Sequence, residues 1–499
     1  MVRLSRAAAG AGHERAGHAM EPMTRRDFVR AVGLGAAAAV SGCRPTARSA
    51  ARPMQPTPNI VFILSDDQRP DTIHALGNPH IRTPCLDRLA AGGAVFTRAV
   101  SPNPICTPSR AEILTGCCGF RNGVIDFGQK IDPALTTWPQ AMRAAGYDTC
   151  YVGKWHNNGR PSTHGYAEAA GLFTGGGAKW ARDQVDHHGR PVTGYRGWVF
   201  QTDAGEKFPE RGVGLTPDIS EAFADAAIDL IRRKRERPFF LHVNFTAPHD
   251  PLLMPTGYER MYDPAAMPLP GNFLPEHPFD HGNLRGRDER LLPWPRTEKD
   301  VREDLAVYFA VISHMDAQIG RIVAAVEACG LWENTLLVFT SDQGLAVGSH
   351  GLRGKQNMYE HTVGVPLILC GPGVPRGRRF HAQVYLRDLY PTVCGLAGVP
   401  VPESVEGKTF LPVLCGEAEA IHPETFGYFR DVQRMIRTER FKLIEYPKIG
   451  RRQLFDLAAD PLERHDLSAD PQHAGVLADL AARLRAAQKR HGDPLLGSA

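Results

Sequence analysis

The segment Cys106-Thr107-Pro108-Ser109-Arg110 places a nucleophile one helical turn before a fixed cation. Thr107 is a good N-cap residue and Pro108 a good first helical residue, so the segment predicts that Cys106 lies just before a helix N-terminus. The free amides and the dipole of a helix start favour negative charge, to which Arg110 adds a guanidinium. This chemistry indicates an activated thiol or an oxyanion site, although a cysteine with no further signal around it would more often be inert.

Further polar residues follow apolar runs that are short enough to be buried strands. We expect strands at residues 59–65, 149–152, 239–245, 335–340 and 365–370. Four of them are followed closely by polar clusters: Asp66-Asp67, Lys154-Trp155-His156, His249-Asp250 and Asp342-Gln343. Because ligands of open α/β sheets bind beyond the carboxyl ends of the strands, the clusters predict one active site at one edge of a sheet.

Helical patterns separate the predicted strands, and the clearest one runs from Leu305 to Val326 and ends at Gly330. The alternation predicts an α/β fold with a large, mostly parallel (mixed) sheet sandwiched by helices. After about Pro400 the pattern changes to antiparallel strands within 434–445 and 453–456 and a closing helix at 473–491. We therefore predict a catalytic domain at 59–400 and a smaller C-terminal α+β subdomain at 401–499.

Two long stretches between these elements, 157–214 and 251–298, are rich in Gly, Pro and charged residues. Long irregular loops in a compact domain usually shape a site. Trp180, Tyr195 and Trp198 lie in the first stretch, where they would either stack on a sugar ring or hold the loop together.

The N-terminal 58 residues resemble an export address rather than a part of the fold. Residues 24–29 (TRRDFV) resemble a twin-arginine export motif, a mildly apolar stretch follows at 31–40, and residues 40–43 (VSGC) match a lipobox. We predict a signal at 1–43 that engages the twin-arginine export machinery, a lipid anchor at Cys43 and a Pro/Arg-rich tether at 44–58. The protein would then act in the cell envelope (periplasm or cell surface) and meet a membrane only through its lipid anchor.

The charge of the chain argues against a nucleic-acid partner. Residues 1–42 hold six Arg against Glu14, Glu21 and Asp27, a balance of +3, so only about +1 of the net +4 remains for the rest of the chain. A nearly neutral chain lacks the basic surface that binds a phosphate backbone.

The signature around Cys106 does not stand alone. Cys-x-Pro-Ser-Arg with the trailing Thr115-Gly116 resembles the signature of the type I sulfatases in the alkaline-phosphatase-like superfamily. Other motifs of that family are matched in the family's order by residues 59–68, 153–156, 248–249, 341–344, 351–355 and 440–460. The resemblance implies an enzyme that cleaves sulfate monoesters, with carbohydrate sulfates as the first expectation and small aryl or alkyl sulfates left open.

The resemblance also implies two cofactors. The cysteine of this signature is oxidised to formylglycine before use, so a separate maturation enzyme would modify Cys106. A metal ion would be held by Asp66, Asp67, Asp342, Gln343 and the modified Cys106. An all-oxygen set with several carboxylates suits Ca²⁺, with Mg²⁺ as the other hard cation of this kind. Many relatives have Asn or His where this chain has Gln343, whose longer side chain can still offer its carbonyl oxygen.

The remaining polar residues of the matched motifs receive catalytic roles by the same resemblance. One hydroxyl of hydrated formylglycine would attack sulfur, with the metal lowering the pKa of that hydroxyl. His249, together with Lys355, would protonate the departing alcohol, and His156 would take the proton from the second hydroxyl so that sulfate leaves. Lys154 and Arg110 would position the sulfate oxygens and the aldehyde hydrate.

Two alternatives stay open at this point. A phosphonate monoester or phosphodiester hydrolase of the same superfamily shares the Cys-x-Pro-x-Arg nucleophile, but phosphate monoesters usually call for a second metal, and no second Asp/His cluster stands out in the sequence. A lipid-tethered binding protein on an inactive sulfatase scaffold would have lost site residues, whereas every expected position is filled here.

Overall fold

The computed structural model of the protein describes residues 57–497. The predicted signal and lipobox, and the tether as far as residue 56, lie outside the described residues. The described residues form one compact unit, which contains a ten-stranded sheet and a separate four-stranded sheet.

The strand β1 (Asn59–Ser65) lies near the middle of the large sheet, whose order is β10-β2-β9-β7-β1-β6-β3-β4-β5, with β8 paired to β2. The other strands of this sheet are β2 (Ala94–Val100), β3 (Asp148–Lys154), β4 (Glu168–Thr174), β5 (Val199–Phe200), β6 (Phe239–Asn244), β7 (Thr335–Ser341), β8 (Gly364–Val365), β9 (Leu367–Cys370) and β10 (Arg378–Tyr385).

The large sheet is mixed and mostly parallel, as predicted. β1 runs parallel to β6 and β7, β3 runs parallel to β4 and β6, and β10 runs parallel to β2. The antiparallel pairs involve β5, β8 and β9. The single strand expected at 365–370 is instead two short strands separated by Pro366, because proline has no N–H to donate to a ladder.

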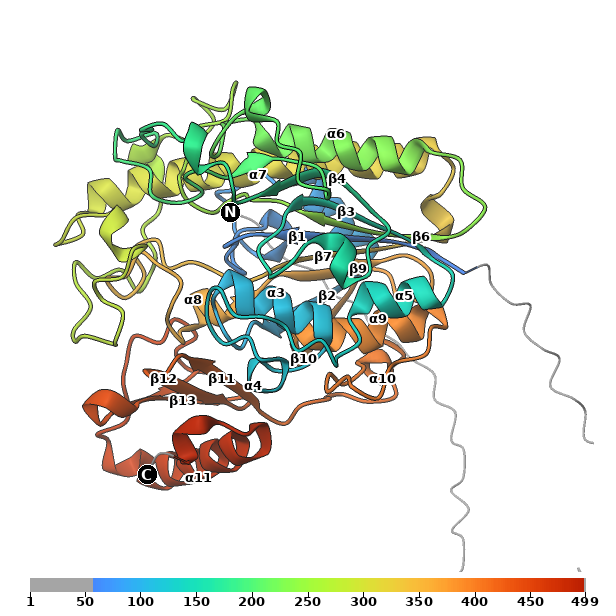
Figure 1. The fold of residues 1–499 in the computed structure, drawn as a ribbon. Helices are drawn as coiled ribbons and strands as arrows, with labels where there is room; N and C mark the ends of the chain where they lie inside the picture. The colour runs from blue at the N-terminus through green and yellow to red at the C-terminus, as the bar shows by residue number, and fades with distance from the viewer. Residues whose placement is uncertain (1–56, 498–499) are drawn as a thin grey trace, which may run out of the picture. The chain divides into compact units, whose positions relative to one another are not determined.

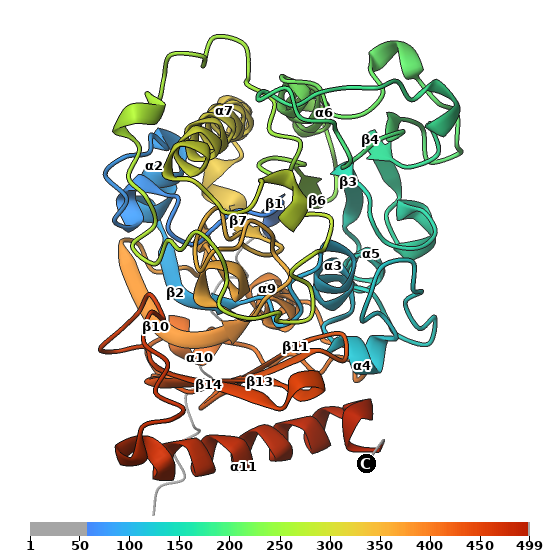
Figure 2. The same ribbon diagram turned by 90° about the vertical axis from the view of Figure 1, so that its left-hand side faces the viewer.

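Helices cover both faces of the large sheet, because β1 is apolar on both sides. Ile60, Phe62 and Leu64 pack with residues of α3, α5 and α9 on one face, whereas Val61 and Ile63 pack with α2, α6 and α7 on the other. Figures 1 and 2 show α6 and α7 on the opposite side of the sheet from α3 and α9. The helices are α2 (Pro84–Gly92), α3 (Cys106–Thr115), α4 (Gly119–Asn122), α5 (Trp138–Ala144), α6 (Ile219–Arg232), α7 (Glu298–Ala328), α8 (Glu360–Val363), α9 (Leu389–Ala397), α10 (Leu411–Leu414) and α11 (Ala474–His491).

The helix predicted between Leu305 and Gly330 is α7, which begins earlier than the apolar pattern does. Thr297 caps its N-terminus by accepting a hydrogen bond from the Asp300 amide. This helix is long and apolar enough to cross a membrane, but 72% of its most apolar window is buried inside the protein. α7 is therefore a core helix of the α/β unit.

The C-terminal part forms an antiparallel sheet of order β11-β12-β13-β14, with α11 packed on it (Figure 2). Its strands are β11 (Thr425–Phe429), β12 (Gln433–Arg437), β13 (Phe441–Tyr446) and β14 (Arg451–Asp456). The predicted α+β character of this region is confirmed, and β11 is a strand that the sequence pattern did not indicate. Gly492 ends α11 in the left-handed region, at φ 67°.

The buried Glu112 side chain links the helix that begins at Cys106 to the C-terminal sheet. Its carboxylate accepts a hydrogen bond from Arg387 Nη1 at 2.9 Å and from the Tyr428 hydroxyl at 2.8 Å. Tyr428 belongs to β11, so the helix that begins at Cys106 is fixed to a strand of the other sheet.

Candidate active site

The carboxyl ends of β1 and β7 bring three carboxylates together. Asp66 and Asp67 follow β1, and Asp342 and Gln343 follow β7, the parallel neighbour whose Ser341 is in register with Ser65. All four side chains are fully buried. Asp67 adopts φ 67°, a left-handed conformation that Asp tolerates better than most residues, and this turns its carboxylate into the site.

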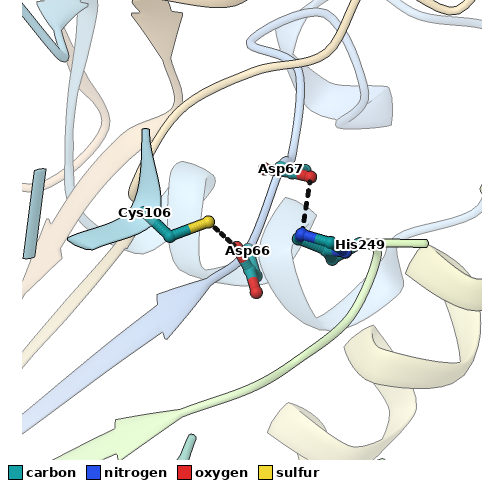
Figure 3. Close-up of side chains that lie close together, drawn as sticks. All are labelled: Asp66, Asp67, Cys106 and His249. Carbon is teal, nitrogen blue, oxygen red and sulfur yellow. Dashed lines mark hydrogen bonds and ion pairs between the residues drawn. The ribbon is translucent and has the colours of Figure 1, made fainter. Parts of the chain in front are cut away.

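Cys106 is the first residue of α3, and the capping predicted from the sequence is wrong in detail. The N-cap residue is Ile105, which has no side-chain cap, whereas Thr107 lies inside the helix and donates its hydroxyl hydrogen bond to the His156 carbonyl at 2.9 Å. Cys106 Sγ lies 3.2 Å from Asp66 Oδ1 (Figure 3). Ser109, one turn later, donates to the Asp342 carbonyl at 2.6 Å and so fixes the helix to the end of β7.

Three buried cations surround the carboxylates. Arg110 donates to Asp342 Oδ2 from Nε at 2.9 Å and to Asn244 Oδ1 at 2.7 Å. Lys154, from the end of β3, forms a short ion pair with Asp66. Lys355 Nζ lies 2.8 Å from Asp67 Oδ2 and 3.2 Å from Cys106 Sγ.

These cations control the charge of the carboxylates unequally. Burial alone would raise the pKa of Asp66, but Lys154, His249 and Arg110 outweigh burial and lower that pKa well below its ordinary value. The pKa of Asp67 is raised to about 7 by burial and by the two neighbouring carboxylates, against the effect of Lys355. The site is therefore short of positive charge around Asp67.

The two predicted catalytic histidines differ in their contacts. His249 Nε2 lies 3.6 Å from Asp67 Oδ2, and Figure 3 shows the ring directed at that carboxylate. His156 lies on the wall of the same pocket as Cys106, and its Nδ1 is buried with no hydrogen-bond partner among residues 57–497. Burial and then Lys154 lower the pKa of His156, so this ring is neutral and able to accept a proton.

All the residues predicted for the site thus meet at one edge of the large sheet. Direct contacts connect the four side chains predicted to bind the metal with Cys106, Arg110, Lys154, His249 and Lys355. His156 joins this group only as a lining residue of the pocket.

Two site residues had no signal of this role in the sequence. Tyr195 lies in the long loop 157–214, and its hydroxyl donates a short hydrogen bond to Asp66. Asp250 was noted only as a polar residue after a strand. It orients His249, because its backbone carbonyl lies 2.6 Å and its carboxylate 3.1 Å from His249 Nδ1, and Arg287 in turn holds that carboxylate at 2.6 Å.

The donor set fits a hard divalent cation. Ligand atoms of Asp66, Asp67, Cys106 and His249 lie within 4.8 Å of one another. The Gln343 Oε1 atom is buried and has no hydrogen-bond partner in the described part of the chain, while its Nε2 faces Asp67 and Cys106. Rotating this amide by 180° would direct the orphaned oxygen to the carboxylates, where a cation would supply the missing partner.

A pocket of about 400 Å³ opens onto Cys106. Its lining includes three aromatic side chains, Phe127, Tyr195 and Trp198, and two arginines, Arg287 and Arg430. This pocket is large enough for a small organic molecule.

Comparison with known proteins identifies the class of enzyme. The sulfatase family model matches residues 58–399, and a model described as N-sulphoglucosamine sulphohydrolase, C-terminal, matches residues 348–490. The chain therefore belongs to the sulfatase family of the alkaline-phosphatase-like superfamily, and it is a sulfatase.

Individual relatives agree with this assignment over nearly their full length. An ulvan-active sulfatase of Formosa agariphila is 27% identical over 481 residues, which cover 93% of this chain and 88% of the relative. A structure solved in complex with its substrate D-glucosamine-2-N,6-O-disulfate is 25% identical with a TM-score of 0.71, covering 88% of this chain and 98% of the other. A phosphonate monoester hydrolase of Agrobacterium radiobacter is also 25% identical, with a TM-score of 0.72 and coverage of 87% and 96%.

Proposed function

We propose that this sulfatase hydrolyses sulfate monoesters of saccharides through a formylglycine made from Cys106 and with a bound Ca²⁺, for which Mg²⁺ would be the substitute. The observation that carries the proposal is the position of Cys106 at the start of α3, between the Asp66 carboxylate and Lys355. A thiol there offers one hydrogen, whereas the reaction requires two hydroxyls on the same carbon.

The metal would be held by Asp66, Asp67, Asp342, Gln343 and the modified Cys106. When bound, a hard cation lowers the pKa of a hydroxyl and so supplies a nucleophile at neutral pH. Its positive charge would also relieve the repulsion among the buried carboxylates, which Arg110, Lys154 and Lys355 offset only in part.

The chain's own residues would bind the anion and move the protons. Arg110 and Lys154 would hold the sulfate oxygens, because their donors already converge beside Cys106. Burial and Lys355 lower the pKa of His249 to about 3, so its ring, which donates from Nδ1 to the Asp250 carbonyl, is neutral before substrate binds. Beside the bound sulfate anion, Nε2 would take up a proton from solvent and deliver it to the departing alcohol, with Lys355 next to it. His156 would accept the proton of the second hydroxyl at its unpartnered nitrogen.

A sulfate ester is favoured over a phosphonate ester as the substrate. The matching family model describes sulfatases, and the ulvan-active relative is a sulfatase, although a phosphonate monoester hydrolase shares the fold. The other group of potential metal ligands among residues 57–497, formed by Asp218, Glu221 and His314, contains none of the residues that line the pocket. The described residues therefore offer no second group of ligands beside Cys106 for the second metal that phosphate monoesters usually call for.

The direct test measures the modification and the activity of one preparation. Mass spectrometry of the tryptic peptide that ends at Arg110 should show the aldehyde or its hydrate in place of the thiol, and sulfated saccharides should release sulfate. Cys106→Ala should abolish turnover while the protein stays folded. Full activity of a preparation whose Cys106 is entirely unmodified would overturn the mechanism.

We also propose that the enzyme works in the cell envelope, on the strength of the motifs at 24–29 and 40–43. Arg25→Lys combined with Arg26→Lys should leave precursor in the cytosol, and Cys43→Ala should abolish labelling by radioactive fatty acid. A wild-type protein found in the cytosol and beginning at Met1 would refute the export proposal and leave the sulfatase assignment intact.

A further inference from the structure

The pocket above Cys106 has an outer part built by residues that take no part in the chemistry. Phe127 lines it with 43% of its surface exposed, and its ring lies 5.7 Å from the His156 ring. The Trp198 ring, which also lines the pocket, has its centre 5.0 Å from the centre of the His156 ring. An exposed aromatic ring beside a polar site provides a face against which the apolar side of a sugar ring can lie.

Arg430 reaches this pocket from the C-terminal sheet. It occupies the turn between β11 and β12 with φ 44°, a left-handed conformation in which non-glycine residues are uncommon. Its guanidinium lies 5.1 Å from the Phe429 ring and pairs with Asp126, at 2.8 Å from Nε and 3.1 Å from Nη2. Asp126 precedes Phe127, so the ion pair and the exposed ring form one side of the pocket.

Arg430 differs from the other permanent cations that line the pocket. Lys355 is buried and bound to Asp67, and Arg287 is shared between two carboxylates, those of Asp250 and Asp288. Arg430 has one carboxylate partner, and the two side chains of this pair are 42% and 31% exposed. Because a solvent-exposed ion pair contributes little, an anion of the substrate can share or replace Asp126 at small cost.

We propose that Arg430 and Phe127 form a subsite for the leaving-group sugar. In this subsite Arg430 binds a second anionic group of the substrate, a sulfate or a carboxylate, while the sugar ring lies on Phe127. This inference rests on the proposed hydrolysis of saccharide sulfates and names the substrate class: saccharides with an anion besides the scissile sulfate. Bidentate donors of a guanidinium match either oxyanion.

The test compares matched substrates that differ only in the second anion. D-Glucosamine-2-N,6-O-disulfate is compared with D-glucosamine-6-O-sulfate, and disulfated disaccharides are compared with their monosulfated forms and with forms in which a carboxylate replaces the second sulfate. The decisive pair is the one that the wild-type enzyme cleaves fastest. Within this pair we expect kcat/KM to be about tenfold higher for the dianionic substrate than for its monoanionic partner, mainly because KM is lower.

Three variants separate the subsite from general effects. Arg430→Gln should reduce the preference to about one, and Asp126→Asn, which releases Arg430 from its pair, should increase it. Arg440→Gln is the matched control, because Arg440 is an exposed arginine of the same sheet that pairs with Asp456 and does not line the pocket. Melting temperatures of the variants exclude misfolding as the cause.

The outcomes separate the two proposals. Sulfate release without a preference for the dianionic substrate, or an equal loss of preference in Arg430→Gln and Arg440→Gln, would overturn the subsite and leave the proposed function standing. The absence of sulfate release from every sulfated saccharide, by a preparation with converted Cys106, would overturn the proposed function itself. Discrimination between the sulfate and carboxylate forms would identify the group that Arg430 binds.

Discussion

The Tyr195 hydroxyl donates a hydrogen bond to the Asp66 carboxylate, although the two residues are 129 positions apart. The same carboxylate oxygen is bound by Lys154, whose ammonium lies 5.1 Å from the centre of the Tyr195 ring. A residue of the long loop 157–214 therefore fixes the orientation of a presumptive metal ligand.

Removing that hydroxyl should weaken metal binding. Tyr195→Phe keeps the ring against His249 and deletes the hydrogen bond, so we expect about a tenfold loss of metal affinity. Calorimetric titration of the metal-free protein with Ca²⁺ measures the affinity directly. Trp198→Phe changes the same loop without touching Asp66 and serves as the control; equal affinities of wild type and Tyr195→Phe would show that the contact has no such role.

Asp250 should act through His249 rather than on the substrate. Asp250→Asn keeps the shape of the side chain but removes the charge that holds His249 Nδ1 and pairs with Arg287. We expect kcat to fall about tenfold to a hundredfold for alkyl sulfates and less for 4-nitrophenyl sulfate, whose leaving group needs little protonation. Asp288→Asn, which also removes a partner of Arg287 but does not contact His249, should affect both substrates alike.

Chelation should remove activity reversibly. Treatment with a chelator followed by dialysis should abolish sulfate release, and Ca²⁺ or Mg²⁺ should restore it, because the donor set is made of oxygen atoms. Asp67→Asn lowers the charge of the set and should reduce Ca²⁺ affinity about a hundredfold. Elemental analysis that found stoichiometric Zn²⁺ bound by His and Cys side chains would refute the assignment of a hard cation.

His277 should make stability depend on pH. Its Nδ1 faces the Phe279 carbonyl at 2.6 Å and its Nε2 the Tyr359 hydroxyl at 3.0 Å, and burial lowers the pKa of its ring to about 4. Between pH 6.5 and 4 the unfolded chain binds a proton at this residue that the folded protein does not bind. Its contribution to the free energy of unfolding therefore falls by about 1.4 kcal/mol per pH unit as the pH decreases.

Urea denaturation at several pH values tests this dependence. The stability deficit of His277→Gln relative to wild type should shrink as the pH decreases from 6.5 to 5, because the variant has no such ring to protonate. His80→Gln changes an exposed histidine and provides the reference. A deficit that stays constant across this range would contradict the assignment.

The sequence predicted the large sheet and the position of the site because strand composition and strand order carry that information. Asp66, Asp67, Asp342 and Gln343 follow runs that are apolar throughout, and parallel neighbours leave their carboxyl ends at one edge. The start of α3 was less predictable. Thr107 is a good cap by propensity, yet here its hydroxyl bonds to the His156 carbonyl, a tertiary contact that outweighs the local preference.

Sequence patterns could not predict the contact of Tyr195 with Asp66 or the places of Arg287 and Arg430 in the pocket. Each of Tyr195, Arg287 and Arg430 lies in a loop or a turn, and each is brought to the pocket by tertiary packing of segments far apart in the chain. Their residue types are common in solvated loops, so no local spacing separates them from other loop residues.

The link through Glu112 has a consequence for the size of the smallest working enzyme. A chain that stopped near residue 400 would keep Cys106 and all the side chains predicted to bind the metal or to act in catalysis. It would lack Tyr428, which holds the helix of the nucleophile, and Arg430, which forms part of the pocket. Such a fragment would keep every hydrogen-bond partner of Cys106 but lose the Tyr428 contact with Glu112 and part of the pocket lining, so the C-terminal sheet contributes to the candidate active site as well as to the fold.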